Sequence, residues 1–458
     1  MDFGFGAADE DFRREARVWL EEHLAGEFAA AAGAGGPGSE HERGEVRRAW
    51  ERELGRGGWI GLGWDAESAE SVAGAADATG GAGATGGADA PDAEKSVYGT
   101  RRATLTQQVV WAEEYARVRA PARCGHVGEN LLAPTLLAYG TQEQKDEFLP
   151  PIARGEALWC QGYSEPGAGS DLAGVRTTAV REGGGGRGAD GADRADGADG
   201  ADRADGADGT YRITGQKIWT SLAHEADWCF VLARTEAGSR RHHGLSFLLV
   251  PMDQPGRIEV RPIRQLTGTS EFNEVFFDGA RARAAHVVGG EGNGWRVAMG
   301  LLGFERGVST LAQQIGFAQE LDGVVREALR AGAAADPVLR DRLVRQWAEL
   351  RVMRWNALRT LGSSGGDDGS PSVAKLLWGG WHRRLGELAM AVRGTAAAVG
   401  PADWSADAPY ELDALQRLFL FSRADTVYGG SDEIQRNIIA ERVLGLPREA
   451  KGPVRGTP

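Results

Sequence analysis

The sequence is poor in cysteine and lacks long apolar runs. Its 458 residues include three cysteines, Cys124, Cys160 and Cys229, which are far apart and form no CxxC pair. This spacing argues against a disulfide framework or a cysteine zinc site and favours a reducing, cytoplasmic location. No apolar run approaches the roughly 20 residues of a membrane helix, and the acidic N-terminus has no signal-peptide core. We therefore expect no membrane span.

Basic residues are also scarce, since 52 Lys and Arg face 65 Asp and Glu, for a net charge of −13. This balance argues against a nucleic-acid partner, which would require a basic face. Two segments rich in Gly, Ala and Asp, 65–95 and 182–209, carry −6 and −5 of that charge. Both lack aromatic residues and apolar periodicity, so we interpret them as disordered insertions in a nearly neutral folded protein.

The rest of the chain divides into three blocks. Residues 1–157 read as helical: Phe12, Ala16 and Leu20 form an apolar stripe, and Thr141 with Gln144 forms a capping-box pattern. Residues 158–288 form a β block with six short segments rich in β-branched and aromatic residues, separated by turn formers. These segments predict strands within 157–164, 211–221, 227–235, 245–252, 258–266 and 274–282. Residues 289–448 predict four long helices, at 293–330, 336–362, 371–399 and 411–444, before a tail at 449–458.

This order of helices, strands and helices predicts an α+β multidomain fold with segregated layers. A Rossmann fold is disfavoured, because strands and helices do not alternate and no GxGxxG motif occurs. The length, at roughly 100–200 residues per domain, fits two to four domains.

Four polar segments could carry chemistry. Tyr163–Asp171 follows a strand and suits a polar ring or phosphate, or is simply a sharp loop. Trp219–Ser221 ends another strand, where a Trp is often core. Glu305 and Arg306 lie in an apolar helical stretch and could mark its solvated face. Tyr428–Glu433 interrupts and restarts a helix, which suits an anion or oxyanion, or an ordinary turn.

Together and in this order, the segments resemble the acyl-CoA dehydrogenase family from about residue 9 to residue 448. The matches are WCQGYSEPGAGSDLAGVRT, ITGQKIWTS, EFNEVFFDGARA and YGGSDEIQRNIIAERVLGLPR. The resemblance implies an N-terminal helical domain, a central β-barrel domain and a C-terminal four-helix bundle. It also implies FAD as cofactor, α,β-dehydrogenation of an acyl thioester, and an electron-transferring flavoprotein as electron acceptor.

The resemblance also implies roles for individual residues. The expected flavin contacts are Gln161, Tyr163, Ser164, Ser170, Trp219, Ser221, Ser431 and Glu433. The expected substrate contacts are Ser170, Arg306, Tyr428 and Gly429.

The chain departs from the family pattern at two places. Many members have their catalytic glutamate where this chain has Gly429, and glycine cannot take a proton. The isovaleryl- and long-chain-type members place it one residue before the entrance arginine, which is Glu305 here, with Asp425 and Glu433 as the next candidates. The Arg-x-x-Phe-Gly segment that reaches a neighbouring subunit's FAD is missing, and Arg330 is its one possible remnant.

The missing segment predicts an oligomer that completes the FAD site. A homodimer or homotetramer would use Arg330, Arg340, Arg342 or Arg345, and a heteromer would take the contact from a related chain; we favour the homo-oligomer. Two other functions stay open: a flavin monooxygenase on the same fold, and a subunit that only completes a partner's site.

Overall fold

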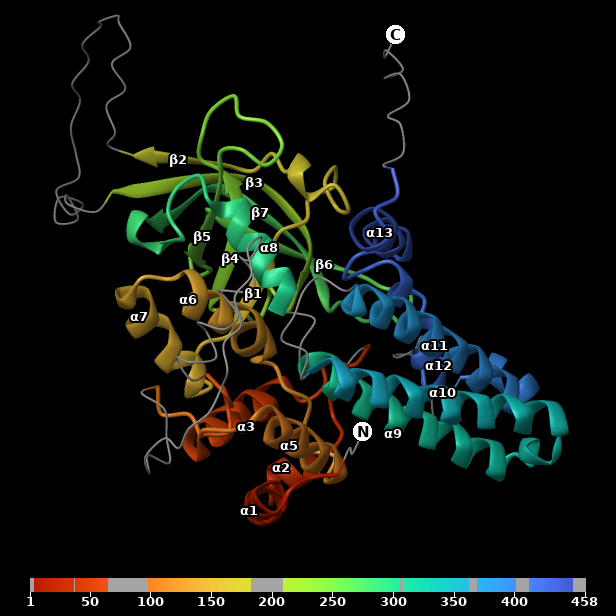
Figure 1. The fold of residues 1–458 in the computed structure, drawn as a ribbon. Helices are drawn as coiled ribbons and strands as arrows, with labels where there is room; N and C mark the ends of the chain where they lie inside the picture. Colours follow the sequence, from red (N-terminus) through yellow and green to blue (C-terminus); the bar gives the residue numbers. More distant parts are fainter. Residues whose placement is uncertain are drawn as a thin grey trace, which may run out of the picture.

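The computed structural model describes residues 4–36, 38–64, 98–182, 209–304, 308–361, 369–400 and 412–447. Helices from the N-terminal part lie against a central sheet, and a second group of helices extends to one side (Figure 1). The predicted insertions fall almost wholly outside the described residues, as do Glu305, Arg306 and the C-terminal tail.

The N-terminal part is helical, as predicted. Its elements are α1 (Ala7–His23), α2 (Glu27–Ala30), α3 (Gly44–Gly57), α5 (Leu105–Arg117), η1 (Gly128–Leu132), α6 (Ala133–Tyr139) and α7 (Gln142–Ala153). Phe12, Ala16 and Leu20 bury the predicted stripe of α1. The predicted capping box begins α7, since the hydroxyl of Thr141 accepts from the backbone N–H of Gln144.

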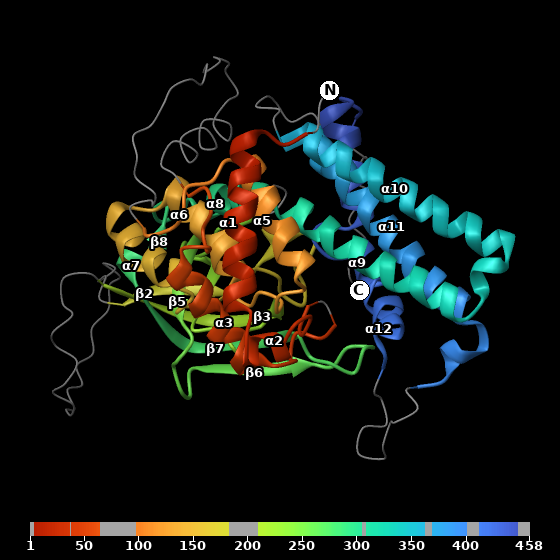
Figure 2. The same cartoon turned by 90° about the horizontal axis from the view of Figure 1, so that it is seen from below.

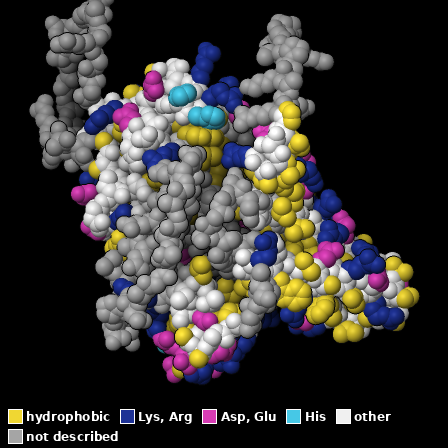
Figure 3. Space-filling model, in the orientation of Figure 1, with side chains coloured by type: hydrophobic (Ala, Val, Ile, Leu, Met, Phe, Trp, Pro, Cys, Tyr) yellow, Lys and Arg dark blue, Asp and Glu magenta, His cyan; other side chains and the backbone are white. Residues whose placement is uncertain are grey.

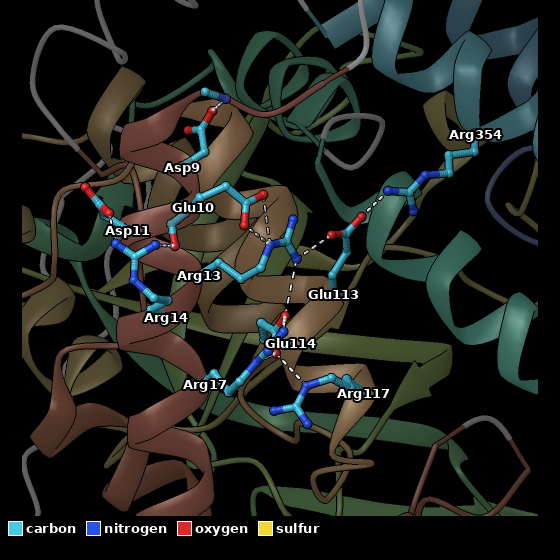
Figure 4. A network of polar contacts seen from close by, with 11 residues as sticks. Asp9, Glu10, Asp11, Arg13, Arg14, Arg17, Glu113, Glu114, Arg117 and Arg354 are labelled. Carbon is cyan, nitrogen blue, oxygen red and sulfur yellow. Dashed lines mark hydrogen bonds and ion pairs between the residues drawn. The ribbon is translucent and has the colours of Figure 1, made fainter.

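Charged side chains join α5 to α1 and to the C-terminal helices (Figure 4). The buried carboxylate of Glu114 on α5 accepts hydrogen bonds from Arg13, Arg17 and Arg117. Its neighbour Glu113 pairs with Arg13 and with Arg354, which extends from the C-terminal helices. The two helical parts are therefore tied together beside the sheet.

The central part is one eight-stranded sheet. Its strands are β1 (Trp159–Gly162), β2 (Thr178–Glu182), β3 (Thr210–Ser221), β4 (Trp228–Arg234), β5 (Leu245–Pro251), β6 (Ile258–Ile263), β7 (Phe272–Arg283) and β8 (Val287–Val288). Their order is β6-β7-β3-β2-β4-β5-β8, and β1 pairs with β4 in parallel. The six predicted strands are confirmed, whereas β2 and β8 were not predicted.

Strands β4 and β5 are buried on both faces. Phe230 and Leu249 point into a core shared with α6, α7 and α8 (Gly294–Phe304). Val231 and Leu248 belong to a second core on the opposite face. This double burial explains why β4 and β5 read as continuous apolar runs. Cys124, Cys160 and Cys229 are buried free thiols.

The C-terminal helices are α8 (Gly294–Phe304), α9 (Val308–Arg330), α10 (Pro337–Leu361), α11 (Ser370–Arg393), α12 (Ala414–Phe421) and α13 (Asp432–Ile438). Figure 2 shows α9, α10 and α11 running side by side away from the sheet. The segment 411–444 is not one continuous helix, because α12 ends at Phe421 and α13 begins at Asp432. Between them Gly429 and Gly430 adopt positive φ values of 62° and 84°, which confirms the interruption predicted at Tyr428–Glu433. No helix within the described ranges has the length and apolar character needed to cross a membrane.

Candidate active site

Backbone and side-chain hydrogen bonds join the loop after β1 to the end of β3. The N–H of Ile218 donates to the carbonyl oxygen of Ser164 at 2.9 Å, and the Lys217 ammonium donates to the carbonyl oxygen of Tyr163 at 3.0 Å. Two segments far apart in the sequence therefore lie side by side, as the expected flavin contacts require.

A buried ion pair fixes this junction. The ammonium of Lys217 lies 2.9 Å from Glu165, whose carboxylate also accepts from the backbone N–H groups of Arg176 and Thr177. Burial opposes the charge on Glu165, but Lys217 and these donors outweigh it and hold the pKa of Glu165 below its usual value. The junction is thus rigid and internally neutral.

Trp219 is held in an unusual conformation at this junction. Its φ is 61°, in the left-handed region that bulky residues rarely occupy, and the pairing of β3 with β7 is irregular between Lys217 and Thr220. The indole is 56% exposed and packs edge-to-face against Phe272, with ring centroids 6.1 Å apart. A large flat ring presented in this way suits stacking against a planar ligand.

The other expected residues of this side lie around the junction. Tyr163 is buried beside Phe230 and Phe247, and Ser221 ends β3 opposite Phe272. Gln161 is a half-buried residue of β1, and Ser170 is exposed in the loop that follows it. Their proposed contacts with flavin and substrate stay predictions.

The Tyr428–Glu433 turn lies among the C-terminal helices and leads into α13. The side-chain amide of Gln435 donates to the carbonyl oxygens of Gly429 and Gly430, each at 3.3 Å. Ser431 is the N-cap of α13, since its hydroxyl accepts from the N–H of Ile434. The Glu433 side chain is 78% exposed and lies 3.8 Å from Arg436, so it faces solvent.

The candidates for the base differ in what the structure says of them. Glu305 and Arg306 lie outside the described residues, between α8 and α9. Both carboxylate oxygens of Asp425 are engaged, one by His382 and the other by the Tyr428 hydroxyl. Asp425 is therefore a poorer candidate for the base than its place in the sequence suggested.

Several residues that hold the site were missed from the sequence. Lys217 follows the inward alternation of Tyr211 and Ile213 on β3, a signal that would have placed its side chain inside. His382 lies on the apolar stripe of α11 between Trp378 and Leu385, where a histidine usually has a buried partner. Glu165 and Gln435 gave no such signal, because each lies in or beside a turn.

A basic depression borders the loop after β1. It has a volume of about 360 Å³ and is lined by Arg176, Arg234, Arg240, Arg241 and Asp171, among others. The guanidinium of Arg234 donates to Ser239 and to four backbone carbonyls, those of Ala173, Val175, Arg241 and His243, so its described partners are neutral. The depression thus carries excess positive charge.

These features define a class. A strained, exposed Trp at a strand end, a rigid polar loop beside it and a glycine turn at a helix start fit a flavin-dependent oxidoreductase built from helices around a sheet. The residues present therefore fit FAD.

The comparisons give the family. Models of the N-terminal, middle and C-terminal domains of acyl-CoA dehydrogenases match residues 93–156, 160–280 and 292–444. The chain belongs to the acyl-CoA dehydrogenase family, which confirms the resemblance, the fold class, FAD as cofactor and an oxidoreductase activity.

Individual relatives agree. The chain is 52% identical to the acyl-CoA dehydrogenase IpdE1 of Mycobacterium tuberculosis over 444 residues, covering 97% of this chain and 99% of that one. Among solved structures, it resembles the Tcur3481-Tcur3483 steroid ACAD, with a TM-score of 0.73, 26% identity and coverage of 98% and 100%. It also resembles the ChsE4-ChsE5 complex of M. tuberculosis, with a TM-score of 0.70, 28% identity and coverage of 98% and 100%.

Proposed function

We propose that this acyl-CoA dehydrogenase uses Glu305 as the base that removes the α-proton of an acyl thioester. Bound FAD supplies the oxidation by accepting the β-hydrogen as hydride. Gly429 has no side chain that could take a proton, so the family's alternative position, occupied by Glu305, is left for this task.

Other residues would bind and orient the flavin and the acyl thioester. We propose that Trp219 and the Tyr163–Ser164 loop hold the flavin ring between them, with Gln161, Ser170, Ser221, Ser431 and Glu433 contributing further contacts. The N–H groups of the Gly429–Gly430 turn would donate to the thioester carbonyl and stabilise the enolate-like transition state. The observation that carries the proposal is the junction of Ser164 with Ile218, which brings the two flavin-side segments together.

The basic depression supports coenzyme A rather than a carrier protein as the thiol. Arg176, Arg240 and Arg241 are exposed around Arg234, and phosphate groups are suited to such a cluster. The nucleotide end of coenzyme A carries three phosphate groups, whereas a carrier protein presents one, as a phosphodiester. We therefore expect R240A/R241A to raise the KM for an acyl-CoA by about tenfold with little change in kcat.

One experiment tests the proposal against its rivals. The flavin-loaded protein is mixed anaerobically with a panel of acyl-CoA thioesters while flavin absorbance is followed. We expect bleaching by at least one saturated acyl-CoA, and reoxidation by an electron-transferring flavoprotein. Rapid oxygen consumption by the reduced protein would instead indicate a monooxygenase. A folded protein that binds no flavin would indicate a subunit that completes a partner's site.

We also propose that the chain assembles with a second subunit. Apolar side chains gather on the surface over the C-terminal helices (Figure 3). Four apolar side chains of α10 are at least 50% exposed: Val344, Trp347, Val352 and Trp355. The Arg330 side chain pairs with Glu327 but is exposed, and because it is exposed a partner's cofactor could reach it. The names of the Tcur3481-Tcur3483 and ChsE4-ChsE5 structures each join two proteins, which supports assembly with a related second chain.

Flavin content separates the two arrangements. Purified alone, a homo-oligomer should carry about one FAD per subunit. An oligomer with half that content or none would favour a related second chain. A monomer with full FAD content would contradict both.

A further inference from the structure

Four polar side chains are joined in series by hydrogen bonds between the C-terminal helices and the Tyr428–Glu433 turn. Glu320 on α9 lies 2.7 Å from Nε2 of His382 on α11, and Nδ1 of His382 lies 2.5 Å from Asp425. The Tyr428 hydroxyl donates to the other oxygen of Asp425 at 2.8 Å. His382 and Asp425 are 3% and 1% exposed, so the centre of this series is buried.

The positive charge on His382 holds these four side chains together. Burial opposes that charge, but the carboxylates of Glu320 and Asp425 outweigh it and raise the pKa of His382 to about 9. Only the protonated ring has two N–H donors, one for each carboxylate. A neutral ring would leave one carboxylate without its donor, and for the buried Asp425 that loss is costly.

Lys375 completes the surroundings. Its ammonium donates to the backbone oxygen of Asp425 and lies 3.8 Å and 4.8 Å from the ring centroids of Trp378 and Tyr428. The titratable groups that contact His382 or its partner Asp425, from α9, from α11 and from the turn, are thus two carboxylates, one ammonium and one phenol. With His382 protonated, their formal charges cancel.

This series of hydrogen bonds ends at the Tyr428–Glu433 turn, which we call the active-site turn. Tyr428 directly precedes Gly429, and a Cβ placed on Gly429 would lie 3.9 Å from the Lys375 ammonium. Gln435 holds the carbonyl oxygens of Gly429 and Gly430 from the other side. The turn is therefore anchored through the Tyr428 side chain as well as through Gln435.

We propose that the His382 imidazolium is a positioning residue for the active-site turn: by holding Asp425 it fixes Tyr428, and with it the backbone of Gly429 and Gly430. His382 does not reach the turn itself, so it acts through its neighbours. The inference goes beyond the proposed function and rests on it only for the kinetic measurement described below.

Hydrogen–deuterium exchange tests the positioning directly. We expect His382→Gln to accelerate exchange of the peptide covering 422–435 by about fivefold or more, because the turn opens locally. Arg384→Gln is the control: it removes an exposed cation from the same helix, where Arg384 pairs with Glu349, and should leave that peptide unchanged. Equal exchange in both variants, or acceleration spread evenly over α9 and α11, would overturn the proposal.

Tyr428→Phe provides a second variant, which removes one hydroxyl from a partly exposed side chain. It should open the same peptide, and it decides the question if His382→Gln does not fold. Unchanged exchange in Tyr428→Phe would also count against the proposal.

Kinetics adds a readout that a merely structural ion pair would not move. Each single variant should slow flavin bleaching by an active acyl-CoA about tenfold, and H382Q/Y428F should be no slower than either. Additive losses would contradict action through Tyr428. If no acyl-CoA bleaches the wild-type flavin, the proposed function fails while the exchange experiment still decides the positioning.

Discussion

At the scale of single residues, the site depends on strain held in place by buried polar contacts. A left-handed backbone at Trp219 costs on the order of 1–3 kcal/mol and persists only where its surroundings fix it. Ile218 is bonded to Ser164, and Lys217 to Tyr163 and Glu165, so the strand end cannot relax. The ring of Trp219 is thereby presented before any ligand arrives, which lowers the cost of ordering the site on binding.

Lys217→Met tests this dependence. The change leaves the Glu165 carboxylate buried without its cation, so we expect a loss of about 3 kcal/mol in unfolding free energy and weaker flavin binding. The matched variant E165Q/K217M removes both charges and should recover part of the stability. Denaturant unfolding and flavin titration measure both effects; an unchanged flavin affinity in Lys217→Met would contradict the role given to the junction.

At the scale of elements, Glu114 is the point where α1 and α5 are joined. Burial opposes its charge, but hydrogen bonds from Arg17, Arg117 and Arg13 outweigh it and lower the pKa of Glu114 to about 2. Because the folded pKa lies below the ordinary value of 4.5, the stabilisation is complete above about pH 4.5 and is lost as the pH falls toward 2. The stabilisation should be less than about 3 kcal/mol, because the side chains of Arg17 and Arg117 are about half exposed and water screens their charges.

Glu114→Gln should therefore lower the unfolding free energy at neutral pH and flatten its dependence on pH between about 5 and 2. Glu21→Gln is the control, since Glu21 is an exposed carboxylate that pairs with Arg117. Unfolding curves recorded at several pH values measure the effect. The same acid sensitivity in wild type and Glu114→Gln would show that Glu114 is not its source.

The hairpin of β2 and β3 predicts how the acidic insertion can be changed. Glu182 already pairs with Thr210, so the strands are in register where residues 183–208 begin and end. Replacing 183–208, and separately 66–94, by short Gly-Ser linkers should leave the flavin spectrum and turnover nearly unchanged. Loss of flavin or of turnover would reveal a functional role for the replaced segment.

At the scale of the whole molecule, local patterns predicted most of the fold. The stripe of α1, the capping box of α7 and six strands could be read from the sequence because each depends on spacing within a few residues. The turn before α13 was also predicted, but the end of α12 at Phe421 was not, because no glycine or proline follows Phe421 before Gly429. The links from Lys217 to Glu165 and from His382 to Asp425 join residues more than 40 positions apart, and no local pattern encodes such contacts.

The assignment of Glu305 as the base that dehydrogenates an acyl thioester rests on the residue types at positions 305 and 429. Its most direct test is the rate of anaerobic flavin bleaching by an active acyl-CoA in wild type, in Glu305→Gln, and in Asp322→Asn, which neutralises an exposed carboxylate on α9 paired with Arg326. We predict that Glu305→Gln retains bound FAD and bleaches at least about a hundredfold more slowly, the usual cost of losing a general base, while Asp322→Asn behaves as wild type. A Glu305→Gln protein that keeps more than about a tenth of the wild-type rate would contradict the assignment.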